Sequence, residues 1–374
     1  MTAPAEQPRQ EGAKIQPDLD AYADALSGWF ERLWPEAREL EVVDLSIPTA
    51  TGFSNETDFF TLRWREGGKA RERRYVARVE PHDGPLFPVQ TPRTAVSVEL
   101  QHRIMSSVAA AGAAPVPPLL PYEPDRSVLG RPFFAMEFVP GVIPADVPRY
   151  TQAGFLVDEA TPEQRARLIE SGLEAMAGVN AIDWRAAGLD WLDPSGEGRP
   201  EMSHQRALYR GYVEAELAGR EHPVLHAALG WLDRHDPRDE RVGLSWGDAR
   251  VGNVIWQDYR CAAVCDWEAC ALCPTEADIG WWLMFDRLSH EGLDAERLPG
   301  FPTRERMIAH YEKVSGREVR QPDYWEVFGL MRFCAIYIRL GDRMVGHGLV
   351  PPEASPAVEN QVTEALAERL EALG

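Results

Sequence analysis

The hydrophobic pattern changes once along the chain, near residue 140, and this change constrains the fold more than any other feature. Before it, β-branched and aromatic residues form short runs between turn residues, as in the segment Phe59-Phe60-Thr61-Leu62-Arg63-Trp64. After it, apolar residues mostly recur at the 3.6-residue spacing of helices. The pattern therefore predicts an α+β chain with two unlike lobes, a small antiparallel β-lobe and a larger helical one.

The smaller lobe is expected to span residues 17–140. It begins with an amphipathic helix over 19–33, which Pro35 ends. The preceding residues 1–16 mix Pro, Gln, Glu and Arg and are expected to form a disordered tail. Strands and one further helix complete the lobe, the strands at 42–45, 59–64, 74–79, 118–120 and 133–138 and the helix at 94–111.

The larger lobe is expected to span residues 141–374. Thr161 and Pro162 give the first of its helices a capping residue and a favourable first position. One β island, residues 244–268, interrupts the helical pattern and is expected to form a hairpin. The predicted helices are 162–179, 204–217, 224–234, 304–314 and 325–345.

The β island holds the residues that suggest chemistry. Asp248 and Asn253 lie five positions apart in a loop, and Asp266 ends the return strand. Phosphoryl transfer needs one carboxylate to orient the attacking hydroxyl, and carboxylate and amide oxygens to bind Mg²⁺. Asp and Asn are also common in ordinary loops because they bond to nearby backbone. With the second aspartate, Asp266, the catalytic interpretation is as well supported as the interpretation of these residues as ordinary loop residues.

These residues resemble the catalytic signature of the aminoglycoside phosphotransferase family, which has a protein-kinase-like fold. The resemblance extends from about residue 40 to about residue 345. It is greatest to the branch related to kinase-like domains that are fused to acyl-CoA dehydrogenases. The matching segments are Ser245-Trp246-Gly247-Asp248-Ala249-Arg250-Val251-Gly252-Asn253 and Val264-Cys265-Asp266-Trp267-Glu268.

The resemblance implies a role for several residues. Asp248 would be the catalytic aspartate beside the acceptor hydroxyl, and Asn253 and Asp266 would be Mg²⁺ ligands. The loop of residues 52–57 resembles the family's nucleotide loop. The ATP-binding residues implied there and in the hinge at 136–140 are Ser54 and Asn55, and the backbone of Glu137 and Val139.

Three positions depart from the family pattern. Trp246 replaces a frequent histidine, and we expect it to pack as a core aromatic. Arg78 stands where the phosphate-binding lysine is usual, and its guanidinium keeps the charge. The helix residue that would pair with this cation is Gln101 by counting back from Gly112, or Glu99 if the helix is shifted by one or two residues. Glu99 is preferred because only it can form an ion pair.

The resemblance thus implies an ATP- and Mg²⁺-dependent enzyme that phosphorylates a hydroxyl group of a small molecule. The departures at Trp246 and Arg78 support an alternative, a pseudokinase-like module that binds a nucleotide or ligand without turnover. A protein kinase is a weaker alternative, because no Gly-x-Gly-x-x-Gly loop or Ala-Pro-Glu segment is recognised.

Composition narrows the partners. Asp and Glu number 59 against 39 Lys and Arg, a formal charge of −20, which argues against nucleic acid. No run approaches the roughly 18 apolar residues of a membrane helix. With no signal peptide apparent, a cytoplasmic location is expected. The five cysteines make a disulfide framework unexpected, and the spacing of Cys261, Cys265, Cys270 and Cys273 makes a zinc site a minor alternative.

The acceptor itself is left open between aminoglycosides, macrolides, hydroxy acids, acyl thioesters and sugars, and so is the oligomeric state. The region expected to bind the acceptor, residues 180–217 and 324–345, is rich in Trp and Tyr. We therefore expect a flatter or more apolar acceptor than a polycationic aminoglycoside. The candidate lining residues are Trp184, Trp191, Tyr209, Tyr212, Phe333, Tyr337 and Arg339.

Overall fold

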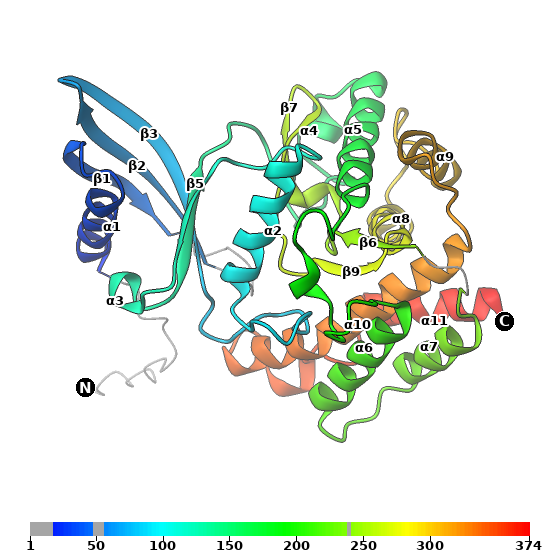
Figure 1. The fold of residues 1–374 in the computed structure, drawn as a ribbon. Coiled ribbons are helices and arrows are strands. Elements are labelled where there is room, and N and C mark those ends of the chain that lie inside the picture. Colours follow the sequence, from blue (N-terminus) through cyan, green and yellow to red (C-terminus); the bar gives the residue numbers. More distant parts are fainter. Residues whose placement is uncertain (1–17, 48–55, 238–240) are drawn as a thin grey trace, which may run out of the picture.

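The computed structural model describes residues 18–47, 56–237 and 241–374. Its largest sheet has five antiparallel strands in the order β1-β2-β3-β5-β4, and a larger, mainly helical part follows (Figure 1). The predicted α+β class is therefore confirmed. The strands are β1 (Arg38–Ser46), β2 (Glu56–Glu66), β3 (Lys69–Val79), β4 (Leu119–Glu123) and β5 (Phe133–Glu137).

Helix α1 (Leu19–Leu33) has the predicted bounds and covers one face of this sheet (Figure 1). Its N-terminus is capped by the Asp18 carboxylate, which accepts the backbone N–H groups of Asp20 and Ala21. Strands β2 and β3 are joined by Gly67 and Gly68, both at positive φ, which suits a tight two-residue hairpin. Residues 69–74 of β3 extend past the end of β5, which pairs only with residues 75–79.

Alternation along β3 sends neighbouring side chains to opposite faces. Tyr75, Ala77 and Val79 join the core with α1. Arg78 consequently points away from α1, toward the helical part of the molecule.

A buried carboxylate lies in the core between α1 and the sheet. Asp58 of β2 is fully buried and accepts a hydrogen bond from the Tyr22 hydroxyl at 2.9 Å. Burial, assisted by Glu56, raises the pKa of Asp58 to about 7, against the opposing charges of Arg131 and Arg78.

Helix α2 (Ser97–Ala111) lies between the sheet and the helical part (Figure 1). Its buried residues Val98, Ile104 and Val108 belong to the large core of the helical part, not to the core of α1 and the sheet. Helix α2 therefore joins the two stretches of sequence on either side of residue 140, because it contacts β4 and β5 while its buried residues belong to the large core.

The segment leading to α2 is also fixed to the helical part. Arg343 donates to the carbonyl of Asp83 at 2.8 Å, and Arg339 donates to the carbonyl of Pro85 at 2.7 Å. The Tyr212 hydroxyl bonds to the carbonyl of Leu86 at 2.8 Å. The connection from β3 to α2 therefore lies along the surface of α6 (Met202–Leu217) and α10 (Pro322–Gly346).

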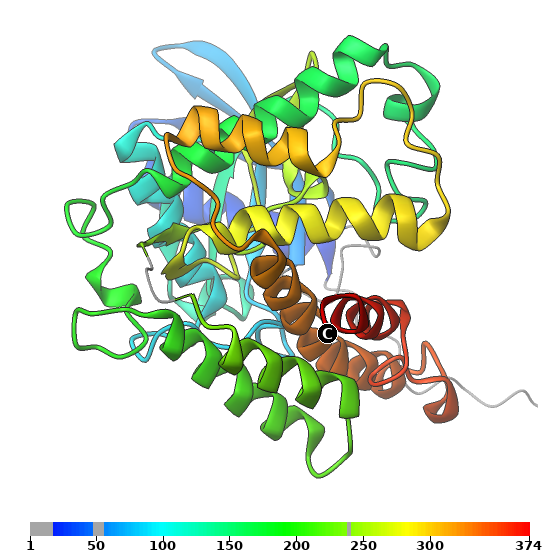
Figure 2. The ribbon, with the colours of Figure 1, turned by 90° about the vertical axis from the view of Figure 1, so that its right-hand side faces the viewer.

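The helical part is viewed from the side opposite the sheet in Figure 2, with α8, α9 and α11 in front. Within the described residues, no helix is sufficiently long and apolar to span a membrane. Helix α5 begins with the predicted cap, since Thr161 and Gln164 form a reciprocal capping box. The helices are α3 (Arg126–Leu129), α4 (Phe155–Asp158), α5 (Pro162–Asn180), α6 (Met202–Leu217), α7 (Pro223–Arg234), α8 (Glu276–His290), α9 (Arg304–Ser315), α10 (Pro322–Gly346) and α11 (Gln361–Leu373).

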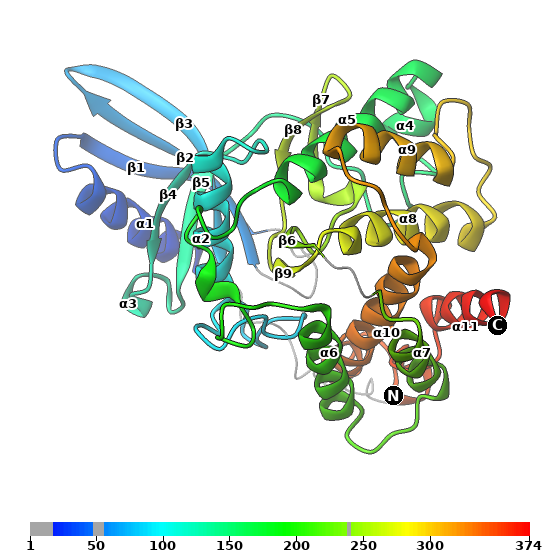
Figure 3. The same ribbon diagram turned by 45° about the vertical axis from the view of Figure 1, so that its right-hand side comes forward.

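The β island contains two strand pairs where a single hairpin was expected. Strands β7 (Val254–Gln257) and β8 (Arg260–Val264) form the hairpin, while β6 (Val242–Ser245) pairs with β9 (Ala271–Pro274). Both pairs lie between the large sheet and helix α8 (Figure 3). The Asp248 loop thus leaves one pair and enters the other.

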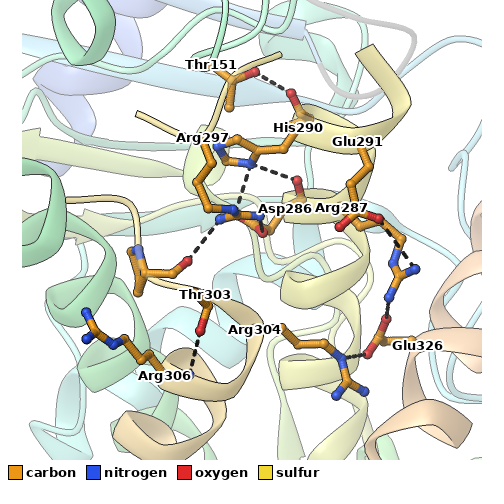
Figure 4. A network of polar contacts seen from close by, with 12 residues as sticks. Thr151, Asp286, Arg287, His290, Glu291, Arg297, Thr303, Arg304, Arg306 and Glu326 are labelled. Atoms are coloured by element: carbon orange, nitrogen blue, oxygen red, sulfur yellow. Dashed lines mark hydrogen bonds and ion pairs between the residues drawn. The ribbon is translucent and has the colours of Figure 1, made fainter. Parts of the chain in front are cut away.

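Ion pairs that involve two buried carboxylates, Asp286 and Glu326, connect helix α8 to its neighbours. Asp286 forms a two-bond ion pair with Arg297, and His290 lies 3.3 Å from the same carboxylate (Figure 4). Glu326 of α10, 1% exposed, accepts from Arg287 of α8 and Arg304 of α9. These pairs fix α8 relative to α9 and α10.

Candidate active site

The loop that carries Asp248 begins with a glycine that the fold requires. Gly247 has φ +89°, and a Cβ there would lie 2.0 Å from the carbonyl oxygen of Ala269. No other residue fits both the conformation and the space. The chain can therefore turn sharply from β6 into the loop.

Asp248 is 7% exposed, and both of its carboxylate oxygens are hydrogen-bonded. Oδ1 accepts the indole N–H of Trp281 at 2.8 Å, and Oδ2 accepts the side-chain amide of Asn253 at 2.7 Å. The Arg250 Nε lies 3.4 Å from Oδ1. The two hydrogen bonds fix the orientation of the carboxylate.

Asp278, at the start of α8, holds the backbone of this loop. Its carboxylate accepts the N–H groups of Trp246 and Gly247 at 2.8 and 2.9 Å. It also accepts the Ser245 hydroxyl at 2.6 Å and the Asn180 amide at 2.7 Å. Burial raises the pKa of Asp278, and these four donors oppose the rise. Asp278 therefore supports the backbone of the loop that carries Asp248.

Trp246 is fully buried, as expected for a core aromatic, and it also makes polar contacts. Its indole N–H is shared between the carbonyls of Cys265, at 2.9 Å, and Asp266, at 3.1 Å. The tryptophan therefore joins the Asp248 loop to the segment that carries the second aspartate.

Asp266 lies two residues after β8, in a left-handed conformation with φ +56°. The N–H of Cys265 donates to the backbone carbonyl of Asn253 at 2.8 Å, which ties the backbone next to Asp266 to that of Asn253, the other predicted Mg²⁺ ligand. Glu268, also buried, follows, and burial together with Asp266 raises its pKa well above the ordinary value.

Arg78 faces Asp266 across a gap. Its Nη2 lies 3.9 Å from Asp266 Oδ1, and both atoms are buried without a hydrogen-bond partner in the described part of the chain. Arg78 Nη1 donates to Thr57 at 2.6 Å. Burial raises the pKa of Asp266, and the charge of Arg78 opposes this. An unsatisfied carboxylate oxygen and an unsatisfied guanidinium nitrogen suit a cation and a phosphate respectively.

Comparison with known proteins identifies the family. The phosphotransferase enzyme family, abbreviated APH, matches residues 49–313, which is most of the chain. The chain belongs to this family.

The curated relatives of this phosphotransferase are longer proteins, and the chain matches only a part of each. It is 29% identical over 232 residues to acyl-CoA dehydrogenase family member 10 of Mus musculus, covering 62% of this chain and 19% of the relative. It is 26% identical over 292 residues to family member 11 of Rattus norvegicus, covering 76% and 34%. The chain thus spans about a fifth to a third of these relatives' length. The expected resemblance to the branch fused to acyl-CoA dehydrogenases is confirmed.

Solved structures share the fold at low identity. A structure described as a putative aminoglycoside phosphotransferase from Ralstonia eutropha JMP134 has a TM-score of 0.65 and 21% identity, covering 93% of this chain and 95% of the other. A GDP complex of aminoglycoside 2'-phosphotransferase-IIIa has a TM-score of 0.55 and 13% identity, covering 96% and 98%. The kinase-like fold is therefore confirmed.

The nucleotide side of the phosphotransferase departs from one prediction. Glu99 accepts from Thr94 at 2.9 Å and lies 3.5 Å from Arg103, one helical turn away. Gln101 is buried and donates to Ser97. Neither meets Arg78, so the expected ion pair between Arg78 and Glu99 is absent from this structure. Ser54 and Asn55 lie outside the described residues.

The hinge residues lie where β5 leaves the sheet. The Glu137 side chain is bonded to Arg73, and its backbone N–H donates to Pro118. In the described residues, nothing accepts the N–H of Val139. Shortly after, Gly141 passes so close to β7 that a Cβ would lie 2.5 Å from Ile255. The hinge is thus pressed against the β7–β8 hairpin.

A row of aromatic side chains extends from Trp281, the residue that donates to Asp248. Trp281, Phe285 and Phe333 have ring centroids 5.0–5.7 Å apart, and Tyr337 lies 5.0 Å from Phe333. Of the expected lining residues, Phe333 and Tyr337 lie in this row. The others lie elsewhere: Trp184, Tyr209 and Tyr212 are buried in the core, Trp191 lies under Arg103, and Arg339 is paired with Glu216.

Two arginines approach the same row. The guanidinium carbons of Arg250 and Arg149 lie 5.4 and 5.9 Å from the Phe285 ring centroid. Arg250 is also paired with Asp146. The row thus combines aromatic surface with positive charge.

Two residues of the site were not anticipated. Trp281 is bonded to Asp248 from 33 positions away. Arg332 of α10 is buried over the Trp281 ring and donates to the Gly247 carbonyl at 2.9 Å. Neither residue lies in a local sequence motif.

The described part of the chain has no group of three His, Cys, Asp or Glu side chains placed for a metal, so the four cysteines form no zinc site.

Proposed function

We propose that this phosphotransferase transfers the γ-phosphate of ATP to a hydroxyl group of a small molecule, with Mg²⁺. The observation that carries the proposal is the juxtaposition of an oriented, buried Asp248 with an unsatisfied pair of polar atoms on Arg78 and Asp266. Such a site can orient a nucleophile and hold a phosphate next to it.

Asp248 would accept a hydrogen bond from the acceptor hydroxyl and orient its oxygen toward the phosphate. Its two fixed donors leave little freedom for the carboxylate, so positioning costs little at the moment of reaction. Arg78 would neutralise the phosphates that are not transferred. The N–H of Val139 and the carbonyl of Glu137 would bond to the adenine edge.

Asp266 and the amide oxygen of Asn253 would hold Mg²⁺. The Asn253 nitrogen already donates to Asp248, so its oxygen is the atom left for a metal. With so few protein ligands, the remaining positions would be filled by phosphate oxygens and water, as is usual for Mg²⁺. When bound, the ion offsets the negative charge of the phosphates.

The acceptor side supports an acceptor that is not a polycation. Arg149, whose guanidinium carbon lies 5.9 Å from the Phe285 ring centroid, would repel one, and the half-buried rings of Phe285, Phe333 and Tyr337 would offer apolar contacts. Recognition of an aminoglycoside would instead need several converging carboxylates. The fused relatives contain acyl-CoA dehydrogenases, so hydroxylated acids and their thioesters belong first in a screen.

The test is a screen of hydroxylated metabolites, macrolides and aminoglycosides for ATP consumption and for a phosphorylated product by mass spectrometry. Transfer to a non-cationic alcohol is the expected result. Efficient phosphorylation of kanamycin, gentamicin or streptomycin would contradict the acceptor class. Nucleotide binding without product from any acceptor would instead favour the pseudokinase-like alternative.

A further inference from the structure

The N-terminus of α2 is capped from another element. Its N-cap residue is Val96, whose side chain cannot accept a hydrogen bond. The Glu80 carboxylate fills this role, because Ser97 N–H donates to Oε1 at 3.1 Å and Val98 N–H donates to Oε2 at 2.9 Å. A carboxylate at this position satisfies two first-turn N–H groups and complements the helix dipole.

The main chain of Glu80 is fixed to the sheet at the same time. Its N–H donates to the Pro132 carbonyl at 3.0 Å, and its carbonyl accepts from Arg131 at 2.8 Å. Arg131 in turn donates to both carboxylate oxygens of Glu56, at 2.9 and 3.0 Å. Glu80 therefore has its backbone in the sheet and its carboxylate on α2.

Glu80 follows Arg78 by two residues at the end of β3. Arg78 forms no ion pair with α2, as shown by the partners of Glu99. Helix α2 packs in the core that also contains Trp246 and Trp281, the residues around Asp248. Glu80 thus supplies a polar link between the end of the strand of Arg78 and the helix that packs in the core around Asp248.

We propose that Glu80 is a positioning residue that sets the distance between Arg78 and Asp266 by holding the end of β3 on the N-terminus of α2. The family resemblance implies an ion pair between a cation on the strand and a carboxylate on the helix. Here the carboxylate belongs to the strand side, and the backbone N–H groups of the helix are the donors. This inference rests on the proposed function, since it concerns the binding of MgATP phosphates.

The experiment compares the full chain with Glu80→Ala and the milder Glu80→Gln, measuring affinity for MgATP and for adenosine by calorimetry. Loss of a helix cap makes the competent arrangement less populated, so MgATP affinity should fall on the order of tenfold in Glu80→Ala. Glu80→Gln should fall less, because its amide keeps one acceptor oxygen. Adenosine affinity should not change, because the hinge is untouched.

Asp18→Ala is the matched control. Asp18 also caps a helix through two backbone N–H groups, but on the far side of the sheet from Arg78. It should lower the melting temperature as Glu80→Ala does and leave MgATP affinity unchanged. In an Arg78→Gln background, Glu80→Ala should cause no further loss of MgATP affinity, since its effect acts through Arg78.

The outcomes separate the two proposals. If the unmodified chain binds no MgATP, the proposed function and the role of Glu80 both fail. If it binds MgATP and the affinity is unchanged in Glu80→Ala and Glu80→Gln, only the role of Glu80 is overturned. Equal losses of MgATP and adenosine affinity, or a full further loss in the Arg78→Gln background, would also overturn it.

Discussion

Asp248 and Arg78 face the same site from different cores, and they are held to different degrees. Asp248 belongs to the large helical core, where Trp281 and Asn253 fix both of its oxygens. Arg78 extends from the sheet, has one hydrogen bond to Thr57 and faces Asp266 across 3.9 Å. Under the proposed function, the side that would orient the acceptor is assembled in advance, whereas the side that would bind the phosphates keeps polar atoms unsatisfied in the described part of the chain.

The largest effect is expected on turnover, from a substitution of Asp248 on the assembled side of the site. Asp248→Asn keeps the shape of the side chain but removes the charge that orients the hydroxyl. Turnover should fall by roughly 10³-fold, about 4 kcal/mol, with little change in MgATP affinity. Steady-state kinetics with the identified acceptor and calorimetry with MgATP check this. Asp146→Asn, which removes an exposed carboxylate paired with Arg250, is the control; near-normal turnover in Asp248→Asn would contradict the assignment.

Substitution of Asp278, which holds the backbone of the Asp248 loop, should have the next largest effect. In Asp278→Asn an amide N–H₂ replaces one acceptor oxygen, so it opposes the N–H groups of Trp246 or Gly247 inside the core. We expect a loss of about 3 kcal/mol in the free energy of unfolding. Urea unfolding followed by fluorescence and by circular dichroism measures it. A loss below the level of an ordinary surface substitution would show that the loop does not depend on this carboxylate.

The incomplete side should respond mainly through binding. Asp266→Ala removes the carboxylate that faces Arg78, so Mg²⁺-dependent nucleotide affinity should fall by about 100-fold or more. Because Oδ1 of the unmodified carboxylate is buried without a hydrogen-bond partner in the described part of the chain, the variant should lose little thermal stability. Calorimetric titrations with ATP, with and without Mg²⁺, separate the metal-dependent part. Equal MgATP affinity in the two proteins would refute the ligand role.

The smallest expected effect concerns the sheet core and its pH dependence. The pKa of Asp58 is about 7 in the folded protein and near 3.8 when unfolded, so the folded state retains the proton longer. This group's contribution to stability is thus present below about pH 4 and is lost as the pH rises to 7. Between pH 5.5 and 8, Asp58→Asn should gain about 1–2 kcal/mol relative to the unmodified chain. Unfolding curves at both pH values test this; parallel behaviour of the two proteins would contradict it.

Features with a local signal could be predicted from the sequence. Helix α1 matches its predicted bounds because its apolar positions repeat regularly up to Pro35. The β2–β3 hairpin follows from alternating residues on either side of Gly67-Gly68. Asp248, Asn253 and Asp266 lie within 19 residues of one another, so one short motif contained them.

Features that depend on distant contacts could not be predicted. Arg332 reaches Gly247 across 85 residues, and nothing near Arg332 distinguishes it from any other helix arginine. Strand β9 is four residues long and fully buried, so it has no alternating pattern. The predicted ion pair between Arg78 and Glu99 assumed that the carboxylate partner of the strand arginine must lie on helix α2. The carboxylate that meets α2 is instead Glu80, on the strand side.

The end of β3 that β5 does not cover has a consequence for behaviour at high concentration. Residues 69–74 extend beyond β5 and expose a strand edge, which in general invites pairing between molecules. Four of these six residues are Lys or Arg, and all six are exposed. Two chains that approached edge to edge here would bring like charges together. The hairpin can therefore project from the sheet without acting as a template for aggregation.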